Sequence, residues 1–580
     1  MNFNIFAQLK EELDDFLTKK IKIGGGDKNA KRKPYEFSQN DTVEVIDYYT
    51  NSKFELGDRD SDGQQKFFIN EVSFRKDVAV KNIDKDVKNY SFIPEEDQAE
   101  YGAIFLRKMF RKWTKKSDKE GNVYGEIMNE MVESFCKYGS VVVKKVGKNV
   151  ELVPLQKLRN DPRAKSLKTA RYVILEHSGL NQEELSLYPD WDISQLDLKW
   201  NSEVDVYERY GFVPLDWYKE YKKEKIEKGD DTKSIKVVAM LAPDADAKTP
   251  EGKVLFCEEA DSVELLEAHY ERQYGRWLGI GEVEKQFENQ KIRNMVFNLR
   301  KKNLAWSAKQ IYQTQDDILV NSLVREVKDG DVLKISTPNG IMRVDTTDRA
   351  SGDFNSIDTM VTENANQRSF SFEVATGEQL KSNTPFRLGA LQSAETDKYF
   401  SNKTDRLSFL FIKVITEFLI PQFEKSIDDE ETVAVFANDE EFDKLRARKT
   451  KVLQTRQFVR DVINEIEPDV EQSSQQINEE LSGKDMDTYT FTREDIKNLK
   501  YTVVIEVNGE SIDLPQKMET LVNLYTALSQ AQDPRAELVL KKLLSIAGER
   551  LPMRPQTQAP AQMPNMENIN AQRQTTTAGE

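Results

Sequence analysis

One stretch of the chain constrains the fold more than any other, because it predicts a single very long helix. Residues 282–313 contain 32 positions without a glycine or a proline. At about 1.5 Å per residue, such a helix would be a rod of roughly 48 Å, several times the ordinary length. Its apolar residues do not form one continuous stripe, and Asn and Gln lie between them. A helix of this kind is too polar for a core and too apolar to stand alone in water. We therefore expect neighbours on its flanks, and identical subunits in a ring would supply them.

Composition and charge bound the class of protein. The 580 residues are enough for about two to four domains, and 38% are hydrophobic and 32% charged, as in a globular protein. The net charge of −16 argues against a surface that grips nucleic acid throughout, because phosphate neutralisation needs Lys and Arg. DNA passing close by is not excluded.

The cellular setting is predicted from cysteine usage and hydropathy. Cys136 and Cys257 are the two cysteines, which leaves no disulfide framework and fits a reducing cytoplasm. The N-terminus does not read as a signal peptide. The most apolar run, 407–420, carries charges and is too short to span a bilayer. We expect a soluble protein that is intracellular when made and has no membrane contact.

The part of the chain before the rod predicts a mixed α/β body. A short amphipathic helix is expected at residues 2–20, followed by a basic arm that reaches residue 34. Further helices are expected at 95–116 and 123–137. Alternating or β-branched runs predict strands at 66–93, 140–146, 150–153, 171–177, 204–208, 237–241 and 254–257.

The part after the rod predicts a small β module and a helix that returns. Residues 331–347 should form a hairpin, because Asn339-Gly340 is the favoured two-residue turn between alternating strands. A second polar helix is expected at 355–374, and a loop after Thr376-Gly377, where Pro385 and Gly389 follow. The remaining expectations are a helix from 407 that Pro421 ends, a helix at 440–466, a polar insertion at about 467–487, a strand at 501–507 turning at Asn508-Gly509, helices at 516–530 and 534–547, and a disordered tail at 551–580.

No motif in the chain predicts nucleotide chemistry or histidine chemistry. Gly24 to Gly26 is not followed by the Gly-Lys-Ser/Thr of a phosphate-binding loop. Gly275, Gly279 and Gly281 precede a rod and not a crossover helix, so a turn is favoured over a dinucleotide site. His177 and His269 lie 92 residues apart without a neighbouring cysteine, which does not favour a zinc site or a Ser-His-Asp arrangement.

Two carboxylate-rich segments resemble metal sites in part. Asp58–Gly63 opens like a calcium loop, but the twelfth position is Ile69 and not the required Glu, so a solvated turn is favoured. Residues 428–443 carry eight acidic residues and no basic one, and they support an alternative carboxylate/metal nucleic-acid enzyme. Because these acids are adjacent pairs and not ligands from separated strands, a solvated acidic edge is favoured. We therefore expect no catalytic residue, no metal and no cofactor.

Two basic segments could meet an acidic partner. The exposed face of 107–116 could touch nucleic acid or a membrane surface, although a solvated helix face is the commoner case. At the end of the rod, residues 300–313 contain Arg300, Lys301, Lys302 and Lys309 and no acid, whereas 282–299 are neutral. A plain surface and an acidic partner or DNA near the rod tip both stay open.

The order of these parts resembles the portal proteins of tailed bacteriophages, with similarity over about 35–550, and portals of short-tailed and crAss-like phages are similar in this order and spacing. The pieces that carry the resemblance are Tyr138-Gly139, Val153-Pro154, Asp161-Pro162, Val206 to Gly211 with Pro214, Gly279-Ile280-Gly281 leading to Glu284, Gln290 and Asn294, and Thr376-Gly377 before the helix to Pro421. The resemblance implies an α+β, helix-rich subunit that assembles into a dodecameric ring. Its parts would be an N-terminal helix and arm (1–34), the wing or body (35–281), stem helices (282–313 and 355–376), a clip with a β-hairpin (314–354), a tunnel loop (377–400), a wing helix and return segment (401–515), crown helices (516–550) and a disordered tail (551–580).

The function that the resemblance implies is a channel at one capsid vertex through which double-stranded DNA is packaged and ejected. The chain would then act in the virion, and in the host cytoplasm during assembly, with the major capsid protein, tail adaptor or head–tail connector proteins and the large terminase subunit as partners. Lys381, Arg387 and Lys398 are the candidate DNA contacts of the tunnel loop, with ordinary loop charges as the alternative. The Asn and Gln residues of the stem would line subunit contacts or the channel. Another virion structural or adaptor protein is the alternative function.

Overall fold

The structure is a computed structural model of the chain. It describes residues 3–23, 35–60, 63–83, 85–94, 100–116, 123–146, 149–186, 188, 190–196, 202–227, 230–244, 250–260, 263–308, 312–314, 341–343, 351–370, 386–426, 430–436, 442–464, 486–492, 503–509, 514–531, 536, 539–540 and 543. The basic arm at 24–34, Lys309, the Asn339-Gly340 turn, Lys381 and the tail at 551–580 lie outside these residues.

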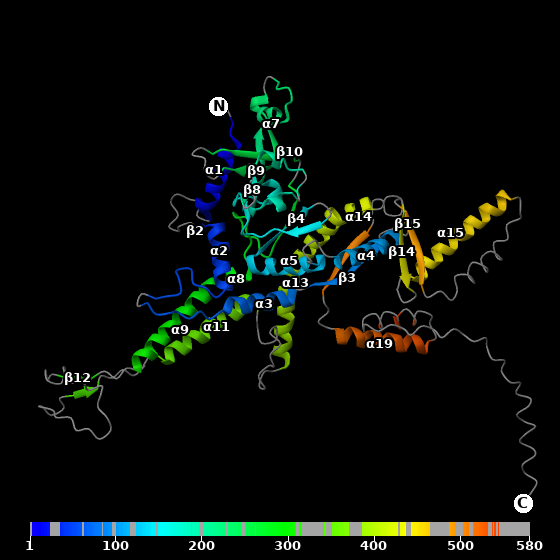
Figure 1. The fold of residues 1–580 in the computed structure, drawn as a ribbon. Coiled ribbons are helices and arrows are strands. Elements are labelled where there is room, and N and C mark those ends of the chain that lie inside the picture. The colour runs from blue at the N-terminus through cyan, green and yellow to red at the C-terminus, as the bar shows by residue number, and fades with distance from the viewer. Residues whose placement is uncertain are drawn as a thin grey trace, which may run out of the picture. The chain divides into compact units, whose positions relative to one another are not determined.

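The chain forms two compact units. Unit 1 consists of Met1–Phe92, Arg107–Phe423 and Ile505–Glu510, and unit 2 consists of Ile93–Leu106, Glu424–Val504 and Ser511–Glu580. Helices and sheets both contribute, so the expected α+β fold class is confirmed (Figure 1).

The largest sheet of unit 1 is antiparallel, with strand order β10-β9-β8-β7-β6. Its strands are β6 (Leu158–Asn160), β7 (Tyr172–Leu180), β8 (Val204–Pro214), β9 (Ser234–Pro243) and β10 (Gly252–Glu259). These confirm the strands expected at 171–177, 204–208, 237–241 and 254–257. The sheet is covered on both faces, because successive side chains of β7 point to opposite sides and reach different cores.

Helix α1 (Ile5–Thr18) covers one face of this sheet, as its amphipathic pattern predicts. Ile5 and Leu9 pack with Ile174 and Val237 in one apolar cluster. The fully buried Arg209 of β8 donates from Nε and Nη2 to the carboxylate of Glu12, both at 2.7 Å. This two-bond pair fixes the position of the helix along the strand.

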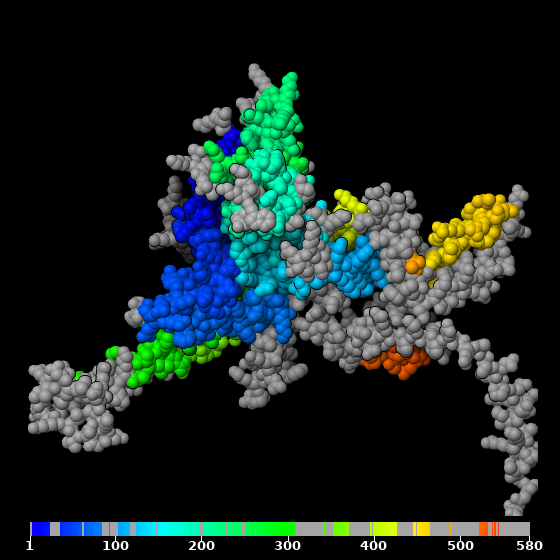
Figure 2. Space-filling view, viewed as in Figure 1, coloured from blue at the N-terminus to red at the C-terminus, as the bar shows by residue number. Residues whose placement is uncertain are grey.

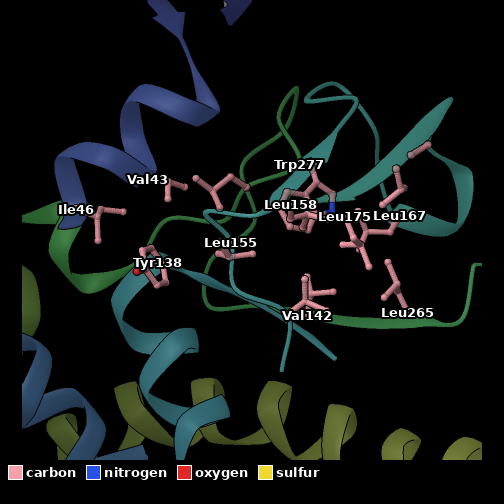
Figure 3. Close-up of a cluster of buried hydrophobic side chains, with 14 of the residues drawn as sticks. Val43, Ile46, Tyr138, Val142, Leu155, Leu158, Leu167, Leu175, Leu265 and Trp277 are labelled. Carbon is pink, nitrogen blue, oxygen red and sulfur yellow. The ribbon is translucent and has the colours of Figure 1, made fainter. Parts of the chain in front are cut away.

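A second sheet, with order β11-β4-β5, lies on the other side of the main core. Its strands are β4 (Ser140–Val146), β5 (Asn149–Leu152) and β11 (Leu265–His269), and α5 (Tyr124–Tyr138) packs against β4. Figure 3 shows the core between this sheet, β7 and α2 (Gln39–Thr50), where Val43, Val142, Leu175 and Trp277 meet. The strand and helix predictions for 123–153 are confirmed.

The strand prediction for 66–93 is wrong over most of its length. Residues Glu71–Ile83 form helix α3, and β3 (Lys85–Pro94) begins only afterwards and pairs with β16 (Val503–Gly509). Valines at 72, 78 and 80 raise the strand propensity, but the buried residues Val72, Val78, Ala79 and Ile83 follow helical spacing.

The predicted rod is present but shorter, and it is interrupted. Residues Glu282–Lys285 form α8, Gln286 has non-helical backbone angles, and α9 runs from Phe287 to Ser307. The next described element is a strand, β12 (Tyr312–Thr314), which pairs with β13 (Ile341–Arg343). Helix α11 (Ser351–Ser369) then returns, and Figure 1 shows α9 and α11 side by side. One continuous helix over 282–313 is therefore wrong, whereas the order helix, β module, helix back is confirmed.

The expected loop at 377–400 is wrong from residue 386 onward, because helix α13 spans Phe386–Lys413. Pro385 lies outside the described residues. Gly389 lies inside α13, where a glycine costs about 1 kcal/mol, which neighbouring helix formers offset. Pro421 also does not end the helix: a π-helical turn (Val414–Leu419) leads into α14 (Ile420–Ser426). After a π turn, Pro421 falls in a first helical turn, where proline is tolerated.

The described residues of unit 2 include an antiparallel strand pair and long helices. Strands β14 (Glu430–Phe436) and β15 (Met486–Thr492) pair antiparallel, and α15 (Phe442–Ile463) and α19 (Leu514–Gln530) confirm the helices expected at 440–466 and 516–530. Helix α4 (Glu100–Thr114) runs from unit 2 into unit 1. The turn expected at Asn508-Gly509 is wrong, because both residues belong to β16.

Candidate functional site

The candidate site is the projecting pair of α9 and α11 together with its root in the body. At the root, two glycine segments far apart in the sequence touch. Gly139 ends α5 in the left-handed conformation, with φ 77°. A Cβ on Gly139 would lie 2.3 Å from the nitrogen of Gly281, and one on Gly279 would lie 2.1 Å from the oxygen of Gly139. The Tyr138-Gly139 and Gly279-Ile280-Gly281 pieces of the resemblance are thus one close backbone contact.

A buried hydroxyl and carboxylate network fixes the start of α8. The side chain of Glu282 is fully buried, and its Oε1 accepts hydrogen bonds from the hydroxyls of Tyr270 at 2.5 Å and Tyr399 at 2.8 Å. Lys285 donates to the Tyr399 hydroxyl at 2.5 Å. Because Tyr399 belongs to α13, this network ties that helix to the root.

An ion-pair group extends the network on the side of β11. Glu271 accepts from Lys285 at 2.7 Å and also pairs with Lys403 of α13. Burial alone would raise the pKa of Glu271, but the hydrogen bonds from the two lysines lower it. Burial lowers the pKa of Lys403, against the opposite effect of Glu271. The root is therefore held by paired charges in a partly buried setting.

One face of α9 binds an extended segment of the same chain through side-chain amides. Gln290, Asn294 and Asn298 follow one another at a spacing of four residues, so they lie on one side of the helix. Figure 2 shows the N-terminal part of the chain, in blue, against the green rod. The bonds are Glu71 N and Val72 N to Gln290 Oε1 (2.9 and 3.2 Å), Gln290 Nε2 to Ile69 O (2.5 Å), Ile69 N to Asn294 Oδ1 (3.0 Å), and Phe67 N to Asn298 Oδ1 and Asn298 Nδ2 to Phe67 O (both 2.9 Å).

These bonds overturn one expectation. The amides of the rod were expected to line subunit contacts or a channel, but Gln290, Asn294 and Asn298 are used within the chain. Gln290 also caps α3, since Glu71 and Val72 are the first residues of that helix and their N–H groups have no partner inside it.

A second face of α9 packs on α11. The contacting residues run in opposite order along the two helices, which makes the pair antiparallel. The contacts are Gln286 Nε2 to Ala365 O (3.3 Å), Arg293 Nε to Asp358 Oδ1 (3.5 Å) and Arg300 Nη1 to Asn355 Oδ1 (3.0 Å). Val361 and Ala365 of α11 are buried, whereas Ile357 of the same helix is 39% exposed.

The third face of α9 is apolar and exposed. At about 100° per residue, Ile292, Met295, Leu299 and Trp306 fall within roughly 60° of one another, about 130° away from the amide face. We call these four residues the apolar stripe. Their exposed fractions are 36%, 57%, 45% and 53%. Such a row of large apolar side chains on one helix face is typical of a surface that another molecule covers.

The predicted basic residues at the rod tip have partners within the chain. Lys301 donates to the oxygen of Gln65 at 2.8 Å, and Lys302 pairs with Asp60 at 2.9 Å. Arg300 bonds Asn355, as above. The structure brings these three cations together, and each of them bonds a residue of the same chain.

The structure describes two of the three predicted tunnel residues, and these two lie in a helix and not in a loop. Arg387 and Lys398 both lie in α13, and the side chain of Lys398 is exposed. In the Asp58–Gly63 segment, Ser61 and Asp62 lie outside the described residues. On either side of them, Asp60 O accepts from Gly63 N at 3.0 Å and Asp60 Oδ1 accepts from Gln64 N at 2.8 Å, as in the expected turn.

Both histidines have structural partners. Ser140 Oγ lies 2.9 Å from His269 Nδ1, and Glu267 lies 3.9 Å from His269 Nε2, which superficially matches a Ser-His-acid order. Ser140 is fully buried and accepts the N–H of Gly279 at 2.8 Å, so no substrate reaches its hydroxyl. His177 lies 3.2 Å from the buried carboxylate of Glu208 in the large sheet.

Two further observations concern metals and membranes. In the described ranges, no group of three or more His, Cys, Asp or Glu side chains is placed to hold a metal ion. Within those same residues, no helix has the length and apolar character needed to cross a membrane.

Comparison with known proteins adds little. No protein family and no curated protein matches the chain. Among solved structures, the neck of an empty GTA particle, computed with C6 symmetry, matches with a TM-score of 0.32 and 10% identity over 65% of this chain and 81% of that chain. At this TM-score the two folds are not shown to be the same.

Proposed function

We propose that the chain is a structural subunit of a portal ring in a bacteriophage virion. In this proposal twelve copies surround a channel at one capsid vertex, through which double-stranded DNA enters and leaves, as the family resemblance implies. The single observation that carries the proposal is the apolar stripe of α9. Two faces of that helix are covered by its own chain, and the third is apolar and exposed.

A second copy of the chain is the occupant that the exposed apolar residues of α11 favour. Met360 of α11 is 66% exposed and Ile357 is 39% exposed, so the other helix of the pair also presents apolar residues to solvent. Burying one large apolar side chain contributes about 1.5–3 kcal/mol. If the apolar stripe of one copy meets α11 of the next, the contact is heterologous, and a heterologous contact whose rotation closes gives a ring.

The order of elements supports the same proposal. Helices α9 and α11 would form the stem, and β12 and β13 would lie at the base of the clip, which would dock a tail adaptor. The large terminase subunit and the major capsid protein would be the other partners. The ring needs no catalytic group in this chain. Lys381, Arg387 and Lys398 remain proposed contacts with DNA.

Two alternatives make different predictions about assembly. Another virion structural or adaptor protein would use the apolar stripe in a smaller or open assembly. A metal-dependent nucleic-acid enzyme would need clustered carboxylates, and the described residues offer no such group.

The test is the mass and shape of the purified full chain, measured by mass photometry and negative-stain imaging. We expect closed rings with a central hole, and we expect Leu299→Glu to break them, because a charge in the apolar contact is left without a partner. The control is Leu56→Glu: Leu56 is 93% exposed and lies outside α9 and α11, so its rings should persist.

A disulfide test separates a ring from a symmetric dimer. Cys136 and Cys257 are buried, so a single Leu299→Cys substitution adds the reactive thiol. In a dimer with the apolar stripes face to face, two copies of this variant crosslink through their thiols. In a head-to-tail ring, the thiols at position 299 of neighbouring copies stay apart. Efficient self-crosslinking in a protein of dimer mass would refute the ring.

A further inference from the structure

The structure contains a basic hollow in unit 1 that the proposed ring contact does not use. Its volume is about 820 Å³, and its walls come from Lys20–Lys22, Arg163–Lys165 and Arg272–Trp277. None of these residues belongs to α9 or α11. We call this hollow the basic hollow.

The charge of the basic hollow is one-sided. Six of its twelve lining residues are Lys or Arg and none is acidic, in a chain whose net charge is −16. Arg276 is buried and neutralised by Glu284 at 2.7 Å, and Arg272 lies 3.9 Å from Glu267. Within the described residues, Lys20, Lys22, Arg163 and Lys165 form no ion pair, and all four are exposed. Their charge is therefore directed at solvent.

Backbone structure holds these cations in place. Ile21 of β1 (Ile21–Ile23) is buried in the main core, so the alternation of the strand directs Lys20 and Lys22 outward. The wall formed by Arg163–Lys165 is joined to the wall formed by Arg272–Trp277 through a hydrogen bond, which Trp277 N donates to Pro162 O at 2.8 Å. Gly275 has φ 92°, and the turn that it allows leaves Tyr274 90% exposed. Glu36 of β2 (Tyr35–Phe37) is the register partner of Lys22 on the neighbouring strand.

We propose that the basic hollow binds the phosphodiester backbone of double-stranded DNA. Lys and Arg supply the attraction, and the exposed Tyr274 hydroxyl supplies a hydrogen-bond donor of the kind that contacts phosphate oxygens. Distant negative charges of the chain do not cancel this attraction, because the screening length is about 10 Å at 0.1 M salt.

Two other occupants are less favoured by the residues present. Single-stranded nucleic acid is bound by several aromatic side chains on which successive bases stack, whereas Tyr274 is the one exposed aromatic side chain that lines the hollow. An acidic protein segment would need the same cations, and residues 428–443 of a second copy carry eight acids. Among the residues that line the hollow, no aliphatic anchor is exposed beside the cations to hold such a segment, so the duplex backbone fits better.

The experiment measures binding of a fluorescent DNA duplex to the full chain by anisotropy over a series of salt concentrations. The test variant combines Lys20→Gln, Lys22→Gln, Arg163→Gln and Lys165→Gln. The control variant changes the same number of exposed cations outside the basic hollow and outside the basic face of 107–116: Lys10→Gln, Lys222→Gln, Lys223→Gln and Lys225→Gln. Both variants alter the net charge equally, so only the location differs. Circular dichroism checks that both are folded.

We expect the test variant to bind at least tenfold more weakly at 0.1 M salt, with the salt slope reduced by about 0.9 for each phosphate that the hollow no longer neutralises. The control should bind within threefold of the unaltered chain, roughly the change expected from net charge alone. Equal weakening of both variants, or no weakening of the test variant, would overturn the proposal. So would preference for single-stranded DNA, or binding of a peptide with the sequence of 426–443 in place of the duplex. Ring assembly is measured separately, so failure of this inference does not decide the proposed function.

Discussion

Replacing Gln290 by Met removes the side-chain bridge between α9 and the start of α3. The change keeps the length of the side chain and removes its donor and its acceptors. Gln290 is fully buried and bonds Glu71 N, Val72 N and Ile69 O. After the substitution, the side chain at position 290 can no longer form a hydrogen bond with any of these backbone groups.

The cost follows from which of these groups can find another partner. Glu71 N also lies 3.0 Å from Ile69 O, so it keeps one acceptor. Val72 is fully buried, and its N–H is left unpaired, which costs about 1–3 kcal/mol. Ile69 is half-buried, so water can partly replace the bond to its carbonyl. We expect a total loss of about 2–4 kcal/mol in the stability of the α3–α9 contact.

Hydrogen exchange is the suitable assay, because it reports local opening in a chain with two units. A loss of that size should speed exchange in peptides covering 63–83 by about 30- to 700-fold. The matched control is Asn298→Leu on the same face of α9. Asn298 also accepts from a backbone N–H and donates to a backbone carbonyl, but both groups belong to Phe67, which is 54% exposed. Water can replace those bonds, so exchange should rise by less than about fivefold, or about 1 kcal/mol.

The reasoning is refuted if both substitutions speed exchange equally, since burial would then not set the cost. It is also refuted if Gln290→Met leaves the exchange of 63–83 unchanged, because the amide bridge would then not hold α3.

Two further predictions concern the root and the large sheet. Gly139→Ala should lower stability by more than about 3 kcal/mol, because the added Cβ would overlap Gly281. Gly57 also has a positive φ, 80°, but open space around it, so Gly57→Ala should cost only the backbone strain of about 1–2 kcal/mol. Thermal melts of the two variants that coincide would contradict this. Burial alone would raise the pKa of Glu208, but hydrogen bonds from His177 and Lys144 lower it from 4.5 to about 2. The lowered pKa gives stability, about 3 kcal/mol in full, that is present above pH 4.5 and lost as the pH falls toward 2. Glu208→Gln should therefore flatten the acid side of the stability curve, and an unchanged curve would show that the carboxylate is not the group responsible.

Local sequence patterns predicted the helices and strands that are determined by the residues of their own segment. Alternating or β-branched runs predicted β7, β8, β9 and β10 of the large sheet but not β6, and the helical pattern at 355–374 predicted α11. Tyr138-Gly139 was predicted to end a helix, and Gly139 does so with a left-handed backbone. These features depend on interactions between residues a few positions apart, so a local pattern is sufficient evidence for them.

The failures share a different cause. Helix α3 was predicted as strand because its valines favour strand, yet its first turn is capped by Gln290, which is 219 positions away in the chain. The amides of α9 gave no sign in the sequence that they would bond residues 67–72 and not a neighbouring subunit. The basic hollow was missed because its cations come from three separate segments.

By itself, the sequence determined the periodic elements and the order of a long polar helix, a β module and a helix that returns. Only the tertiary structure decided which faces of the rod are already occupied and which is left over for another molecule. The physical reason is that periodicity records the distance between side chains along one helix or strand, whereas satisfaction of a buried amide or cation depends on groups that the fold brings from hundreds of residues away. The apolar stripe became recognisable as a contact surface once the other two faces of α9 were covered.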